Sequence, residues 1–100
     1  MQEALVVQVE DWVKKMIVEV GRLSIPADEI DIEEPLVGGK VDIDSLGFIE
    51  LMLSVEENLN VEIPEDVWKQ THTVRDIARV LVEHVKRDDW NSILSQEAKT

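Results

Sequence analysis

Hydrophobic residues recur at steps of three and four positions along most of this chain, which is the spacing of amphipathic helices. The first such stretch covers residues 2–22, and its apolar stripe consists of Leu5, Val9, Trp12, Val13, Met16, Ile17 and Val20. Further helices are expected over residues 45–58, over residues 65–70 as a short helix, and from Thr73 to about residue 86. No stretch alternates apolar and polar residues as a strand would. The pattern therefore predicts an all-α bundle of three main helices and one short helix.

The polar residues between these stretches mark where the helices begin and end. Asp44 or Ser45 is suited to cap the start of the second helix, and Asn58 and Asn60 mark its end. Pro64 suits the first position of the short helix. Before the fourth helix, the run Thr73-Val74-Arg75-Asp76 resembles a capping box.

Residues 24–43 are predicted to form a long loop between the first two helices. They contain Pro26, Pro35 and the pair Gly38-Gly39, and loops of this length in compact domains often carry function. Ile30, Ile32 and Leu36 are expected to pin the loop to the core. We place the domain at residues 1–86 and read residues 87–100 as a tail that is partly ordered or forms a short extra helix.

The second helix has two apolar faces. At 100° per residue, its core stripe consists of Phe48, Leu51, Met52, Val55 and Leu59. A second apolar set, on the opposite side among acids, consists of Leu46, Ile49 and Leu53. A bundle helix buries one face, so the second set indicates a protein-docking surface. The alternative is that the long loop covers part of it, at Ile49.

Composition narrows the possible partners. The net charge is −12, from 22 acidic and 10 basic residues, which disfavours nucleic acid and anionic membranes and favours a basic protein surface. There is no cysteine, so disulfides and thiolate sites are excluded. No signal peptide or membrane span is evident, and we expect a cytoplasmic monomer. No residue pattern indicates a catalytic arrangement or a metal site.

Three features of the sequence together resemble the acyl carrier protein family, which includes the peptidyl carrier domains. The run Asp44-Ser45-Leu46 opens the second helix, apolar and acidic residues follow it, and Ile63-Pro64-Glu65 starts the short helix. Thr73-Val74 matches the opening of the last helix. The resemblance extends over residues 12–85 and implies a four-helix acyl-carrier-like bundle.

The resemblance also implies a function for Ser45. A separate phosphopantetheinyl transferase would attach 4'-phosphopantetheine to its hydroxyl, and the thiol of this arm would carry an acyl or aminoacyl group as a thioester. A helix N-terminus favours an attached phosphate. The alternative reading is that Ser45 is only a helix cap. The candidate docking residues, from the second apolar face and the acids beside it, are Asp44, Leu46, Ile49, Glu50, Leu53, Glu56 and Glu57.

Two positions depart from the family pattern. Gly47 stands where many acyl carriers have an acid, which removes one charge and loosens the first helical turn. Trp68 lies in the short helix, which borders the acyl pocket in acyl carriers, and its bulk would fill or reshape that pocket. We therefore expect weak sequestration of long acyl chains.

The leading hypothesis is a non-catalytic acyl carrier for fatty-acid, polyketide or related biosynthesis. Its partners would be the transferase and acyl-loading and acyl-processing enzymes with basic docking patches. One alternative is an aminoacyl or peptidyl carrier protein, which the high acidity modestly disfavours. Another is an acidic helical interaction module that never carries a group.

Overall fold

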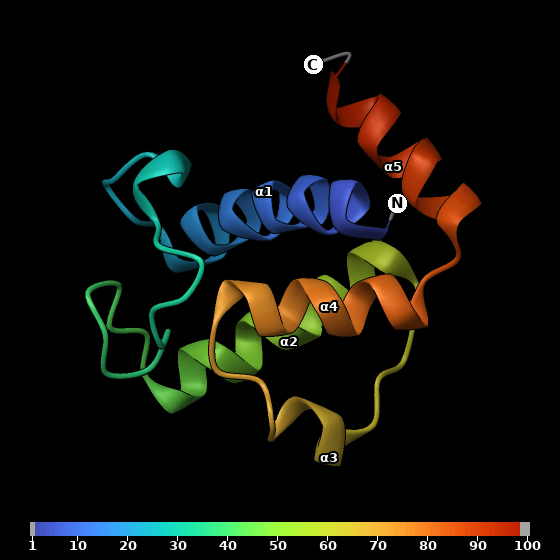
Figure 1. Ribbon diagram of the computed structural model, residues 1–100. Coiled ribbons are helices and arrows are strands. Elements are labelled where there is room, and N and C mark those ends of the chain that lie inside the picture. Colours follow the sequence, from blue (N-terminus) through green and yellow to red (C-terminus); the bar gives the residue numbers. More distant parts are fainter. Residues whose placement is uncertain (1, 99–100) are drawn as a thin grey trace.

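The computed structural model describes residues 2–98, and all of their regular structure is helical. Three long helices form the bundle: α1 (Gln2–Gly21), α2 (Ser45–Leu59) and α4 (Val74–His84). The single turn α3 (Glu65–Trp68) lies between α2 and α4, and α5 (Arg87–Ala98) follows α4. Figure 1 shows α5 crossing beside the start of α1, while α2 begins at the other end of the bundle. The all-α fold class is confirmed.

The core is built from the apolar stripes that the sequence pattern predicts. Val9, Val13 and Ile17 of α1 are fully buried, as are Ile77 and Leu81 of α4. Among the pairs of elements, α1 and α4 pack against each other most extensively. None of the helices formed by residues 2–98 is long and apolar enough to cross a membrane.

Local hydrogen bonds explain where the helices start and stop. At α4, the Thr73 hydroxyl accepts from the Asp76 N–H at 3.1 Å, as the capping box predicts. The Asp76 carboxylate accepts from His72 N–H at 3.0 Å, one residue before the position that a standard box uses. At the end of α2, Asn60 adopts the left-handed conformation with φ 54°, the usual C-terminal arrangement for Asn or Gly. Pro64 is the N-cap of α3, one position earlier than predicted.

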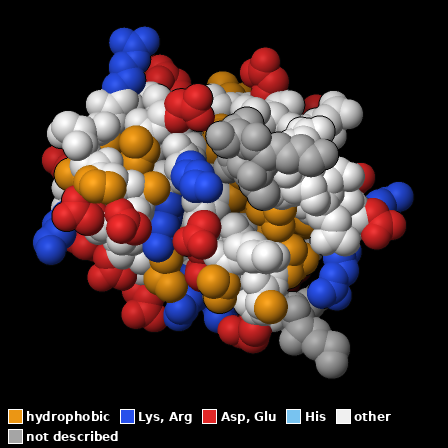
Figure 2. All heavy atoms as spheres, turned by 90° about the horizontal axis from the view of Figure 1, so that it is seen from above, with side chains coloured by type: hydrophobic (Ala, Val, Ile, Leu, Met, Phe, Trp, Pro, Cys, Tyr) orange, Lys and Arg blue, Asp and Glu red, His pale blue; other side chains and the backbone are white. Residues whose placement is uncertain are grey.

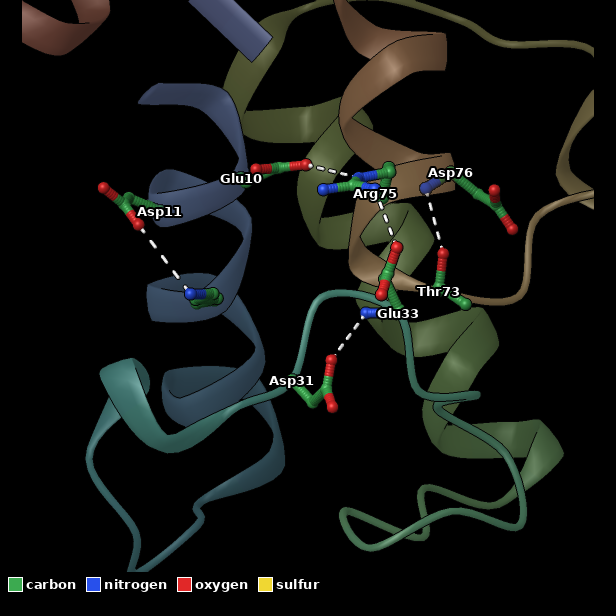
Figure 3. Close-up of polar contacts among 8 residues, drawn as sticks. Glu10, Asp11, Asp31, Glu33, Thr73, Arg75 and Asp76 are labelled. Carbon is green, nitrogen blue, oxygen red and sulfur yellow. Dashed lines mark hydrogen bonds and ion pairs between the residues drawn. The ribbon is translucent and has the colours of Figure 1, made fainter. Parts of the chain in front are cut away.

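The loop before α2 is long, but it is fixed to the bundle. It contains one 3-10 turn, η1 (Ala27–Glu29), and buries Ile30 and Leu36. Leu36 N–H donates to the His72 carbonyl at 2.8 Å. In Figure 3, the Arg75 side chain reaches Glu10 of α1 at 3.3 Å and Glu33 of the loop at 2.8 Å. Arg75 thus joins α4, α1 and the loop that leads to α2.

The C-terminal segment contributes to the same core. The Trp90 side chain of α5 is fully buried. Its ring meets Trp12 edge to face, with centroids 5.5 Å apart and planes at 79°. Its Nε1–H donates to the Leu81 carbonyl at 3.4 Å. Residues 99 and 100 of the predicted tail lie outside the described residues, and the domain boundary at residue 86 stays a prediction.

Candidate functional site

Ser45 is the first residue of α2, and its side chain is exposed. The N-cap is Asp44, whose carboxylate accepts from Gly47 N–H at 2.7 Å. Of the two caps that the sequence allowed, the structure therefore uses Asp44, and the Ser45 hydroxyl is not needed for this purpose. An exposed hydroxyl beside the positive end of a 15-residue helix is well placed to carry a phosphate.

The structure gives a reason for glycine at position 47 that the sequence did not show. A Cβ atom at this position would lie 2.9 Å from Ile43 Cγ2 and 3.1 Å from Asp44 Oδ1. Glycine therefore lets the segment before α2 pack closely over its first turn and keeps the cap in place. The close packing of Ile43 and Asp44 against Gly47 acts against the loosening predicted for this turn.

Substitutions at Asp44 can separate the effect of its capping hydrogen bond from the effect of its charge. We expect Asp44→Ala to lower the free energy of unfolding by about 1 kcal/mol, because the Gly47 N–H loses its acceptor. Asp44→Asn keeps an equivalent cap and should cost far less. Urea unfolding of both variants checks this. Equal losses in the two variants would show that the carboxylate charge, and not the cap, stabilises α2.

A groove of about 680 Å³ runs from Ser45 along α2 toward α3. Its α2 wall includes Phe48, Ile49, Met52 and Leu53, and its far wall includes Trp68 and Lys69. A smaller hollow of about 270 Å³ lies between the end of α1 and the start of α2. Gly47 and Glu50 line this second hollow. Ser45 lines the large groove, and Gly47 and Glu50 do not.

The two apolar faces predicted for α2 are present. Leu51, Met52, Val55 and Leu59 are buried, and Phe48 is partly buried. Leu46, Ile49 and Leu53 are 65%, 53% and 59% exposed. Because Ile49 is open, the long loop does not cover this face as the alternative reading required.

The acids of α2 differ in how they are used. Glu50 and Glu57 are exposed. Glu56 is partly buried, and its carboxylate accepts from Ile63 N–H at 2.8 Å. It thus fixes the connection that leads to α3. The sequence indicated only a docking role for Glu56, as for Glu50 and Glu57.

The face seen from above in Figure 2, on the side of α1 and α5, differs from the α2 row. Its described hydrophobic side chains gather in small groups separated by acidic and basic residues. Such scattered exposure is ordinary for a protein surface. The row of Leu46, Ile49 and Leu53 on α2 is therefore the more informative apolar feature.

Trp68, in the groove wall, has a buried indole nitrogen without a hydrogen-bond partner. The residue is 8% exposed, and among the described residues its Nε1 is the only buried side-chain polar atom without a hydrogen-bond partner. Leaving such a donor unsatisfied costs about 1–3 kcal/mol. The sequence predicted a bulky side chain at this place, but gave no sign of the unpaired N–H.

Comparisons with known proteins agree with this arrangement. Residues 11–81 match the family described as "Phosphopantetheine attachment site". An acyl carrier protein of Clostridium perfringens strain SM101 is 32% identical over 77 residues, which cover 77% of this chain and 97% of that protein. The chain belongs to the acyl carrier protein family.

Two other acyl carrier proteins give similar values. That of Zymomonas mobilis is 35% identical, covering 72% of this chain and 88% of its own length. That of Picosynechococcus is 30% identical, covering 76% and 90%. Family membership makes this chain a non-catalytic carrier that is modified by a separate phosphopantetheinyl transferase. Helix α5 lies beyond the residues that match the family.

Phosphopantetheine fits the residues at the start of α2. Ser45 offers an exposed hydroxyl that the helix cap does not require. The groove that begins at Ser45 is lined mostly by apolar side chains and can receive part of an arm or its cargo. When bound, the group supplies a terminal thiol, which this cysteine-free chain lacks.

Proposed function

We propose that Ser45 is the attachment point and that the chain carries acyl intermediates of fatty-acid, polyketide or related biosynthesis. The observation that supports this is the exposed Ser45 at the start of α2, next to a cap that does not use its hydroxyl. In the loading step, the Ser45 oxygen attacks the phosphorus of coenzyme A that bears the pantetheine. The bond between this phosphorus and the oxygen that bridges to the second phosphorus breaks, and 3',5'-ADP leaves with that oxygen.

The transferase supplies the activation for this step. A base on the transferase would accept the hydroxyl proton, and magnesium bound there would offset the phosphate charge. The positive end of α2 favours the attached phosphate once the transfer is complete. Ser45 is thus a tether point and has no catalytic role of its own.

The exposed row on α2 is our candidate docking surface. Apolar contact would come from Leu46, Ile49 and Leu53, whose exposure is unusual for such residues on one helix. Acidic steering would come from Asp44, Glu50, Glu56 and Glu57. This arrangement suits partner enzymes with basic patches around an apolar centre. The expected monomeric state and cytoplasmic location stay predictions.

Trp68 would shape the space available to cargo. It lines the groove together with Phe48 and Met52, so it narrows the path that a chain from Ser45 would take. Weak sequestration of long acyl chains remains our expectation.

Intact-mass measurement tests the proposed function directly. The full chain is incubated with coenzyme A, magnesium and a broad-specificity phosphopantetheinyl transferase. We expect complete conversion to a species heavier by one phosphopantetheine. An unmodified chain, under conditions in which a known acyl carrier protein is converted, would overturn the proposal.

A further inference from the structure

Trp68 lies in the wall of the groove that begins at Ser45, and its buried indole N–H is unpaired. Trp68 and Ser45 both line this groove, so an arm attached to Ser45 would start at its edge. By contrast, the indole N–H of the fully buried Trp90 has the Leu81 carbonyl as its acceptor. A buried donor without a partner is rare in folded proteins and calls for an explanation.

The charged side chains that line the groove already have partners. The Glu56 carboxylate accepts from Ile63 N–H. Glu65 pairs with Lys69 at 4.0 Å at the exposed rim. Among the described residues that line the groove, Trp68 therefore offers the one buried donor still able to meet a ligand atom.

The chemistry of this donor restricts its partner. An indole N–H donates and cannot accept, so the partner must carry an oxygen with a free lone pair. Glu56 and Glu65 line the same groove, and their charges disfavour an anion. The apolar walls formed by Phe48, Met52 and Ile63 suit a hydrocarbon chain. These conditions describe an acyl chain with a neutral keto or hydroxyl oxygen.

We propose that Trp68 is a specificity-determining residue that makes this carrier favour oxygen-substituted acyl cargo over unsubstituted chains. This inference rests on the proposed attachment at Ser45. An unsubstituted chain would cover the N–H without giving it an acceptor, whereas a keto or hydroxyl oxygen would pair with it. The discrimination arises because a buried polar group is costly only while it is unpaired.

Access to the N–H requires a small movement of the groove wall, because Nε1 is covered in the unloaded chain. Helix α3 is a single turn between two non-helical connections (Figure 1). Trp68 is its last residue, and the Thr71 hydroxyl donates to the Trp68 carbonyl at 2.7 Å. Such a short element can shift as cargo enters while its C-terminal hydrogen bond is kept.

The first test compares matched cargoes. The transferase loads Ser45 from octanoyl-, 3-oxooctanoyl- or 5-oxooctanoyl-coenzyme A, and loading is confirmed by intact mass. Hydrolysis of the thioester at mildly alkaline pH, which leaves the ketone in place, is then measured relative to the same acyl-pantetheine free in solution. We expect the better-fitting oxo chain to be protected about 3- to 10-fold more than octanoyl. Equal protection of all three cargoes would overturn the inference.

Variants show whether the N–H is responsible. Trp68→Phe keeps an aromatic ring but removes the donor, so the preference should fall to about one. Trp12→Phe is the matched control, because Trp12 lies on α1 against Trp90 and should leave the preference unchanged. A preference that survives Trp68→Phe would contradict the proposal.

A measurement on the unaltered sequence does not depend on how the variants fold. The indole N–H signal of Trp68 should move downfield with oxo cargo, and should not do so with octanoyl cargo. The arm itself contains amide carbonyls, so the unacylated arm is measured too. An equal shift with the arm alone would assign the donor to the arm and overturn the cargo preference. Failure to load Ser45 at all would instead refute the proposed function, on which this inference depends.

Discussion

Replacing Ser45 by alanine is expected to leave the chain entirely unmodified by coenzyme A and a phosphopantetheinyl transferase. The hydroxyl oxygen is the atom that would bond to phosphorus, and alanine has no equivalent. The fold should not change, because Asp44 and not Ser45 caps α2. Surface substitutions of this kind alter stability by about 0.5 kcal/mol or less. Intact mass shows the loss, and circular dichroism shows that the variant is folded.

Ser54 provides the matched control on the same helix. It lies nine positions beyond Ser45 in α2, so Ser54→Ala removes a hydroxyl from the same element and should leave modification complete. Peptide mapping of the modified wild-type chain should place the added mass on the peptide that contains Ser45. An adduct that persists in Ser45→Ala, or that maps elsewhere, would refute the assigned attachment point.

Much of the site could be predicted because it depends on local rules. The two faces of α2 follow from helical periodicity, which fixes which side chains share a direction. The Thr73 cap follows from residue type and spacing. The family resemblance supplied the meaning of Ser45, which periodicity alone would have left as one of two possible caps.

Other features depend on contacts between distant residues and could not be read from the sequence. Glu10 is 5% exposed, although it lies off the apolar stripe expected for the first helix. Its partner, Arg75, lies 65 positions away. The Trp68 N–H is likewise unpaired because the fold brings no hydrogen-bond acceptor within reach of it. Such features become visible only when the chain is folded.

Trp90 is the clearest case of a distant contact with a large expected effect. We expect Trp90→Ala to lower the free energy of unfolding by about 3–5 kcal/mol, because it removes a fully buried ring from the core. The change also removes the edge-to-face contact with Trp12. Urea unfolding monitored by circular dichroism measures the loss across the whole bundle.

Two controls on α5 separate packing from other effects. Trp90→Phe keeps a ring in the core but loses the N–H bond to Leu81, and should cost less than alanine. Asn91→Ala changes the exposed neighbour and should change stability by about 0.5 kcal/mol or less. If Trp90→Ala were also nearly neutral, α5 would be an appendage and the domain would end near residue 86. A large loss would instead make α5 a structural part of the carrier domain.

In Figure 1, α5 lies at the opposite end of the bundle from the start of α2. Folded Trp90→Ala should therefore still accept phosphopantetheine, because a core contact far from Ser45 supports the fold without shaping the attachment point.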